Sequence, residues 1–251
     1  MMLQELRRTS TRPVERVAYL VGAALCTSGL LHLVVLVVSG TTWEGPLSYR
    51  KAMTFGLSFG LTLATLAWAT SFLRMNERVR TLLLGAFTAV SVVETALVTM
   101  QVWRGVPSHF NFETGFDTVV SMMLAAGGGV IIVTVLGFTV AALRSASGLS
   151  PSMLLALRFG LVVLLVSLGV GALMIADGVT LSRGGQPQLA YTTAGALKPV
   201  HAVAMHAILV VPALAWLLRF TSWTERRRTR VVAAVAVGYA VVVAGTWLLF
   251  G

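Results

Sequence analysis

Charged residues and cysteine are both scarce in this sequence. Only 11% of the 251 residues are charged, nine of them acidic, and Cys26 is the single cysteine. One cysteine cannot form an internal disulfide, and the bulky Leu25 before it does not fit a lipoprotein processing site. No Gly-Lys-Ser/Thr sequence follows the glycines at 127–129, so no phosphate-binding loop is predicted.

Long apolar runs take the place of the missing charge. The chain is 57% hydrophobic and has a mean hydropathy of +0.86. Runs of about 20 apolar residues span a bilayer, and lipid forces them into helices because it offers the backbone no hydrogen bonds. The first run is about twice the length of a signal-peptide core, which predicts a retained helix. We therefore expect an all-α bundle of seven transmembrane helices forming one domain over residues 1–251, with spans at 17–39, 52–73, 81–103, 117–143, 152–176, 197–218 and 231–250.

Positive charge is unevenly divided between the two sides of this bundle. With the N-terminus inside, thirteen arginines fall on the cytoplasmic side, and the other side holds five basic residues: Arg50, Lys51, Arg104, Arg183 and Lys198. Short cytoplasmic loops are rich in Lys and Arg, so we expect a cytoplasmic N-terminus and an extracytoplasmic C-terminus. The net charge of +10 then indicates contact with anionic lipid headgroups and no nucleic-acid partner.

Polar chemistry gathers on the extracytoplasmic side. The connections 41–51, 104–117 and 177–198 lie there, and the second of them, RGVPSHFNFETGFD, is densely polar. Ionisable residues also occur inside the predicted spans, where they are costly and face a bundle interior or wet cavity: His32, Glu94, His201 and His206. Glu94, Gln101 and Arg104 fall on one helical stripe. The pattern predicts a polar pocket that opens outward.

The main hypothesis is an enzyme that acts on a lipophilic small molecule by acid/base chemistry and needs no cofactor. A buried carboxyl with a stabilising partner suits such chemistry. The catalytic candidates are Glu94, Asp117, His109, His206 and Asp177. The candidates for substrate binding are Gln101, Arg104, Asn111, Lys198, His201, Trp103 and Lys51.

Two alternatives use the same residues differently. A zinc or haem enzyme would take its ligands from His32, His109, His201 and His206. His201 and His206 are five residues apart, about 140° around a helix, so they do not form the i, i+4 zinc pair, but His32 and His206 could form a haem pair. A proton-coupled transporter or binding protein for an organic anion would use Arg50, Lys51, Arg104 and Lys198 for the anion and Glu94 for the proton.

Two segments of the sequence resemble those of a known family. RGVPSHFNFETGFD and GALKPVHAVAMHAILVVPALAWLL resemble a family of bacterial, especially actinobacterial, polytopic membrane proteins, which implies a bacterial plasma-membrane location and no particular activity. Size and architecture are similar to small membrane-bound terpene cyclases, which implies protonation of a prenyl chain, a lyase or isomerase reaction, by a buried carboxylic acid. A looser similarity to the alkaline ceramidase and progestin-receptor-like hydrolases implies zinc, although their H-x-x-x-H is H-x-x-x-x-H here.

Overall fold

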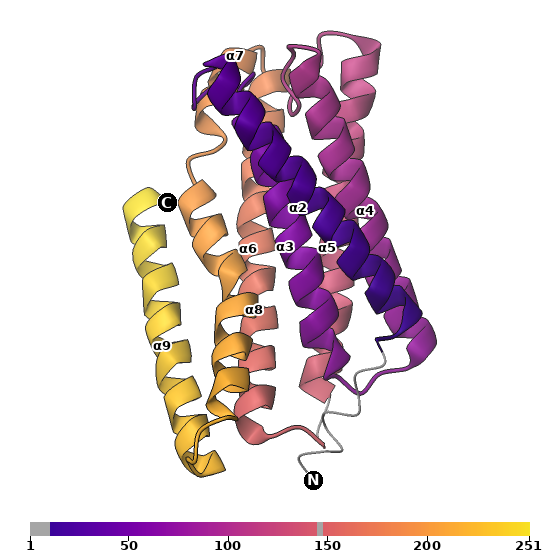
Figure 1. The fold of residues 1–251 in the computed structure, drawn as a ribbon. Coiled ribbons are helices and arrows are strands. Elements are labelled where there is room, and N and C mark those ends of the chain that lie inside the picture. Colours follow the sequence, from indigo (N-terminus) through magenta and orange to yellow (C-terminus); the bar gives the residue numbers. More distant parts are fainter. Residues whose placement is uncertain (1–10, 145–147) are drawn as a thin grey trace.

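Seven long helices make up most of the computed structural model, which describes residues 11–144 and 148–251 (Figure 1). They are α2 (Pro13–Ser39), α3 (Arg50–Ser71), α4 (Glu77–Trp103), α5 (Gly115–Arg144), α6 (Pro151–Arg183), α8 (Lys198–Leu218) and α9 (Glu225–Phe250). A short helix, α7 (Pro187–Thr193), lies between α6 and α8. Within the described residues, these seven helices are long and apolar enough to cross a membrane, which confirms the expected multi-pass helical fold.

Local sequence explains where the helices begin. Proline stands in the first turn of α2, α6 and α8, where its missing N–H costs nothing and its fixed φ suits a helix. The side chain of Asn76 accepts a hydrogen bond from the backbone of Arg78 and so caps α4. Thr224 caps α9 in the same way through the backbone N–H of Arg227.

Small residues allow the closest helix pairs. A Cβ on Gly56 of α3 would lie 2.7 Å from the carbonyl oxygen of Leu25 in α2, and a Cβ on Gly60 would lie 2.6 Å from that of Gly22. The backbones of α2 and α3 therefore touch, as small-xxx-small patterns permit in membranes. Gly160 of α6 plays the same part against Ile208 of α8.

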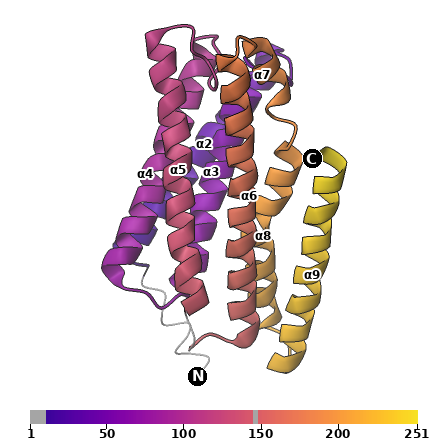
Figure 2. The same cartoon turned by 180° about the vertical axis from the view of Figure 1, so that it is seen from behind.

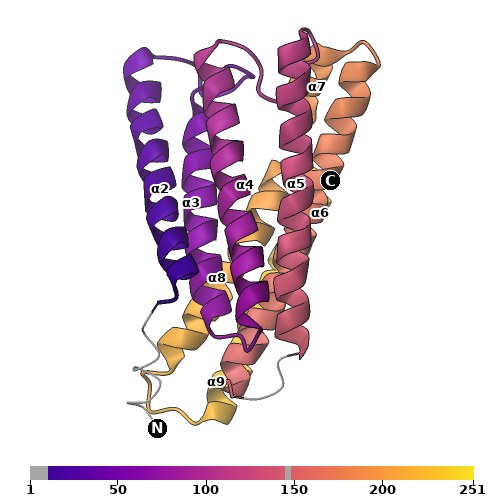
Figure 3. The same cartoon turned by 90° about the vertical axis from the view of Figure 1, so that its right-hand side faces the viewer.

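The long helices form two neighbouring groups. The first group contains α2, α3, α4 and α5, and the second contains α6, α8 and α9. Helix α2 crosses the outer face of α3 and also contacts α4 (Figure 1), and α4, α5 and α6 stand side by side in the reverse view (Figure 2). Helices α8 and α9 pack on α6 and lie behind the first group in Figure 3. The two groups are joined through the contacts of α5 with α6 and of α3 with α8.

The two ends of the bundle differ in composition, and we name them by that difference. The arginine end carries the start of α2, the α3–α4 turn, the end of α5 and the α8–α9 connection, with Arg12, Arg74, Arg78, Arg80, Arg144, Arg219, Arg226, Arg227, Arg228 and Arg230. The mouth end carries the connections 40–49, 104–114 and 184–197. At the mouth end the chain runs down from α7 before α8 begins at Lys198, so α8 starts below the ends of α4, α5 and α6 (Figures 1 and 2).

The largest difference between a helix and its expected span is at the end of α6. Helix α6 continues to Arg183, seven residues beyond the expected end at 176, because the first glycine pair that stops it is Gly184 and Gly185. Asp177 is therefore a helical residue and not part of a loop. The connection expected over 177–198 is also shorter and contains α7.

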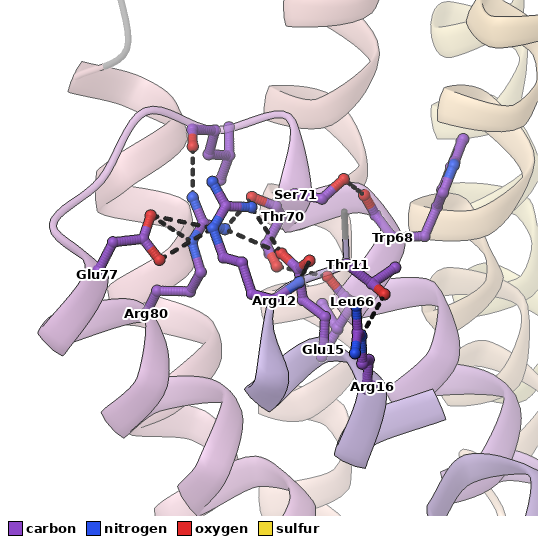
Figure 4. A network of polar contacts seen from close by, with 11 residues as sticks. Thr11, Arg12, Glu15, Arg16, Leu66, Trp68, Thr70, Ser71, Glu77 and Arg80 are labelled. Carbon is purple, nitrogen blue, oxygen red and sulfur yellow. Dashed lines mark hydrogen bonds and ion pairs between the residues drawn. The ribbon is translucent and has the colours of Figure 1, made fainter. Parts of the chain in front are cut away.

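A buried ion-pair network closes the arginine end (Figure 4). The guanidinium of Arg80, only 1% exposed, donates to the carbonyl oxygens of Thr70 at 2.5 Å and Leu73 at 2.7 Å, which end α3. Arg12 pairs with both Glu15 and Glu77, at 2.9 Å each. The network ties α2, α3 and α4 together, and Arg80, expected only as a topology signal, is a structural residue.

Candidate functional site at the mouth end

Asp117 is the centre of a hydrogen-bonded clamp. Its carboxylate, 2% exposed, accepts from Gln101 at 2.9 Å, from Arg104 at 2.6 Å and from Thr114 at 2.7 Å. Arg104 also donates to the side-chain oxygen of Gln101. The structure thus brings together Gln101, Arg104 and Asp117, but the carboxylate is fully engaged in holding α4 to α5. This geometry supports a structural role for Asp117 better than a catalytic one.

The connection between α4 and α5 is fastened at its centre. The hydroxyl of Ser121 in α5 donates to the carbonyl of Asn111 at 3.0 Å and accepts from its backbone N–H at 3.2 Å. Phe110 has a φ of 61°, unusual for a bulky residue, and its carbonyl accepts from Ser182 of α6 at 2.7 Å. Its ring fills the space that a Cβ on Gly178 would need. These contacts hold the connection against α5 and α6.

His109 is carried inward by this fastening. Its ring lies 5.6 Å from the ring of Phe55 in α3 and 5.9 Å from that of Phe110, centroid to centroid. Its Nδ1 is 2.9 Å from the hydroxyl of Ser108. Burial lowers the pKa of His109 to about 3, and repulsion from the nearby ammonium groups of Lys51 and Lys198 contributes to this lowering. The imidazole is therefore neutral near pH 7.

Lys51 and Lys198 are the only two lysines in the sequence, and the positive charge of each acts on His109. Lys51 is in the first turn of α3 and Lys198 is the first residue of α8. Their ammonium groups are close enough to repel each other, and Arg50 adds further positive charge. The ammonium group of neither lysine has a hydrogen bond or ion pair with any residue that the structure describes.

The acidic residue that acts on Lys198 already has an ion-pair partner. Glu44 pairs with Arg50 at 2.9 Å, and Arg50 also donates to the carbonyl of Trp43 at 2.8 Å. Glu44 attracts Lys198 through space, but the positive charge of Arg50 and the two lysines exceeds the charge of this one carboxylate. The lysine pair, meaning Lys51 and Lys198, is therefore a cationic site without a matching counter-ion.

Glu94 lies deeper in the bundle and faces α5. Its side chain is 4% exposed, and its Oε1 occupies the space that a Cβ on Gly127 would fill, so the absence of a side chain at Gly127 makes room for the carboxyl. Oε1 is buried without a hydrogen-bond partner among the described residues. An ionisable group at this depth without a partner is costly, which marks Glu94 as a functional candidate.

His32 and Trp103 bind each other between α2 and α4. The indole N–H of Trp103 donates to Nε2 of His32 at 3.0 Å, and Nδ1 of His32 lies 2.7 Å from the carbonyl of Ser28. Both ring nitrogens of His32 are therefore engaged. Trp103 is 57% exposed and packs edge-on against Tyr49, two residues before Lys51, so it lies at the rim of the mouth end.

The two histidines of α8 point in different directions. Nδ1 of His201 lies 2.8 Å from the carbonyl of Ser167 in α6, and the hydroxyl of Ser167 donates to the carbonyl of His201 at 2.8 Å. His201 thus fastens α8 to α6. His206 is exposed, and its Nδ1 lies 2.6 Å from the carbonyl of Ala202 in its own helix.

These positions give little support to a metal or haem centre. No group of three or more His, Cys, Asp or Glu side chains within residues 11–144 and 148–251 is arranged to hold a metal ion. A haem between His32 and His206 would require His32 to lose its bond to Trp103. Asp177, also considered catalytic, is exposed on α6.

Sequence reasoning missed one of two unpartnered polar groups near the mouth. The amide Nδ2 of Asn111 and the hydroxyl of Tyr191 in α7 are buried without a hydrogen-bond partner among the described residues. Burial, together with Glu113 and Asp117, raises the pKa of Tyr191. Asn111 was expected from its loop, whereas Tyr191 lies in a helix that the sequence did not indicate.

The fold and the site together define a multi-pass helical membrane protein with a cationic mouth. Comparisons with protein-family models, curated proteins and solved structures find no match for the chain.

Proposed function

We propose that the protein binds an organic anion at its mouth end, with Lys51 and Lys198 as the anchoring groups. The excess of arginine at the opposite end favours an extracytoplasmic mouth, as the positive-inside rule predicts. The anion then reaches the site from the outer side of the membrane.

The observation that carries this proposal is the lysine pair without a counter-ion. Charged side chains in or near a bilayer normally pair with one another, because an unpaired charge pays most of its desolvation cost without compensation. At the arginine end the buried Arg80 has two carbonyl partners and two neighbouring carboxylates. The ammonium groups of the half-buried Lys51 and the exposed Lys198 have no such partner among the described residues, so Lys51 carries most of this cost and a bound anion would supply the missing partner.

Glu94 gives this binding function a route to proton coupling. It lies below the mouth on the same helix as Gln101, and its carboxyl has no competing ion pair among the described residues. Intramembrane carboxyls of this kind serve as proton sites in transporters. A proton-coupled transporter would use both the lysine pair, to bind the anion, and Glu94, to carry the proton.

An acid/base enzyme acting on a lipophilic molecule is the second candidate. The unpartnered Oε1 of Glu94 favours it, because a buried carboxyl is the usual acid in such chemistry. The other catalytic candidates expected to act with Glu94 give this enzyme less support. Asp117 is engaged in the clamp, and His206 and Asp177 are exposed. Conversion of a lipophilic substrate that is lost in Glu94→Gln would support this candidate over transport.

The test uses the fact that the chain has only two lysines. Purified protein in a non-ionic detergent is treated with an amine-reactive acylating reagent, with propionate or methyl phosphate as the probe and chloride at equal ionic strength as the control. Mass spectrometry then reports the modification rate of Lys51, Lys198 and the N-terminal amine separately. We expect at least one organic probe to slow both lysines without slowing the N-terminal amine.

Two variants sharpen this test. Lys51→Met should weaken protection of Lys198 about tenfold, the effect of losing one charge-assisted hydrogen bond. Arg78→Met removes the same charge from an exposed position at the arginine end and should leave protection unchanged. Modification rates that are equal with chloride and with both organic probes would overturn the proposal.

A further inference from the structure

We propose that the anion is amphiphilic: its headgroup lies on the lysine pair and its hydrocarbon chain lies in a crevice between α5 and α6. This inference rests on the proposed anion binding and names the class of ligand. It predicts a ligand of the lipid type, with a phosphate or carboxylate headgroup, in preference to a small water-soluble anion.

The crevice is built from apolar side chains of three segments. Phe110 and Phe112 come from the α4–α5 connection, Met122 and Ala125 from α5, and Ile175 and Val179 from α6. Its polar lining is limited to His109 and Ser121, and the hydroxyl of Ser121 is already bonded to the backbone of Asn111. Such a surface suits a hydrocarbon chain and offers nothing to a second charged group.

His109 joins the crevice to the cationic site. It is one of the residues that line the crevice, and it lies close enough to Lys51 and Lys198 for both ammonium groups to act on it. The imidazole is neutral near pH 7, so it does not repel a chain beside it. A cationic anchor and an apolar slot that meet at one residue match a molecule with an anionic head and an apolar tail.

The crevice lies beside the lipid-facing surface of the bundle. Met122 is 47% exposed, and Val119, one turn earlier on α5, is 56% exposed. A chain could therefore enter sideways from the bilayer while its headgroup stays at the mouth. This route suits a ligand drawn from the membrane.

The crevice contains very little free space. Its free volume is about 10 Å³, close to the minimum that holds one water molecule. Side chains must move to admit a chain, and the flexible, half-exposed Met122 can do so at low cost. The ring of Phe110 is seated against Gly178 and is a less mobile wall.

The experiment compares methyl phosphate, butyl phosphate and octyl phosphate by lysine protection, with the protein in nanodiscs of zwitterionic lipid. Ala125→Leu fills the crevice, and Ala126→Leu adds the same atoms to the next, exposed position as the matched control. We expect protection to strengthen with chain length in the wild type and in Ala126→Leu. In Ala125→Leu, octyl phosphate should lose this advantage about tenfold while methyl phosphate protects as before.

The outcomes separate the two proposals. If none of the phosphates nor propionate protects the lysines, the proposed anion binding itself fails. If methyl phosphate protects and chain length adds nothing, or if Ala125→Leu and Ala126→Leu show the same chain-length advantage, anion binding stands and the amphiphile is wrong.

A second measurement covers the case in which Ala125→Leu does not fold. Octyl phosphate with a photoreactive group at the end of its chain is cross-linked to the wild-type protein, and the modified residues are mapped. Cross-links within 122–125 and 175–179 support the crevice. Cross-links confined to other helices would overturn it.

Discussion

The two ends of the bundle treat positive charge in opposite ways. At the arginine end Arg80 is completely buried and donates to the last carbonyls of α3, with Glu15 and Glu77 close by. Arg158 similarly donates to the carbonyls of Ala142 and Leu143 at the end of α5. At the mouth end Lys51 and Lys198 lie at helix starts and lack any partner among the described residues.

Helix direction explains part of this difference. The carbonyl end of a helix attracts cations, and the N–H end repels them. Arg80 and Arg158 belong to the N-terminal parts of α4 and α6, but their guanidinium groups reach the carbonyl ends of the neighbouring helices α3 and α5. Lys51 and Lys198 also lie at the N–H ends of their own helices, where no such carbonyl end is within hydrogen-bonding distance of their ammonium groups among the described residues. Positive charge thus stabilises the arginine end of the bundle. At the mouth end the charge of the lysine pair is not neutralised by the described residues, which favours an anionic ligand.

The largest effect is expected from the arginine end. Arg80→Gln removes the guanidinium from two buried carbonyls and from Glu15 and Glu77, and breaking a buried pair of this kind costs about 3–5 kcal/mol. The measurement is the unfolding free energy in mixed micelles of SDS and a non-ionic detergent. Arg78→Gln, two residues away and exposed, should stay within about 0.5 kcal/mol of the wild type. Equal effects in both variants would contradict a structural role for Arg80.

A smaller loss is expected from the Asp117 clamp at the mouth end. Asp117→Asn keeps the size of the side chain but leaves Arg104 without its carboxylate and weakens the bonds from Gln101 and Thr114. Because Arg104 is partly exposed, we expect a loss of about 1–3 kcal/mol in the same unfolding assay. Glu113→Gln, an exposed acid of the same connection, is the control. If Asp117→Asn unfolds like this control, the clamp does not stabilise the mouth.

The lysine pair should respond with the opposite sign. Lys51→Met removes an unpaired charge and keeps an unbranched apolar side chain, so we expect the unfolding free energy to rise by up to about 1 kcal/mol, a small value because the side chain is only partly buried. Anion protection of Lys198 should be weakened in the same variant. A clear loss of stability instead would mean that Lys51 has a structural partner and would remove the contrast between the two ends.

The sequence predicts the helices well because lipid leaves little choice. Runs of apolar residues of spanning length must be helical, so all seven were expected, and the helices differ from the expected spans at their ends, as in α6, where Asp177 continues the helix. The stripe of Gln101 and Arg104 could also be predicted from helical spacing, and Asp117 from its place at the start of the next span.

The site could be predicted less well, because its geometry depends on contacts between distant segments. Lys51 and Lys198 are far apart in the chain and meet only because α3 packs on α8. His109 lies inward because Asn111 and Phe110 are fastened to α5 and α6. Arg78 and Arg80 look alike in the sequence, and only packing shows that one is exposed and the other buried.

The smallest expected effect at neutral pH links His109 to the lysine pair. The unfolded chain takes up a proton at this histidine near pH 6.5, whereas the folded protein, in which the pKa of His109 is about 3, does so only in stronger acid. Between these values the unfolded state binds more protons, so the unfolding free energy falls as the pH is lowered from about 6.5 towards 3. His109→Gln removes this contribution. Its unfolding midpoint should match the wild type at pH 7.5 and fall less steeply on acidification, measured in non-ionic detergent.

Methyl phosphate connects this pH dependence to the comparison of the two ends. An anion on the lysine pair would offset the positive charge that opposes protonation of His109, so it should flatten the acid slope of the wild type. The same addition should change the slope of His109→Gln only by the amount that follows from the protonation of methyl phosphate itself at about pH 6, because that variant has no imidazole to protonate. Parallel curves for wild type and variant, with and without methyl phosphate, would show that His109 does not sense the lysines, and the mouth end would then lack the coupled cationic cluster that distinguishes it from the arginine end.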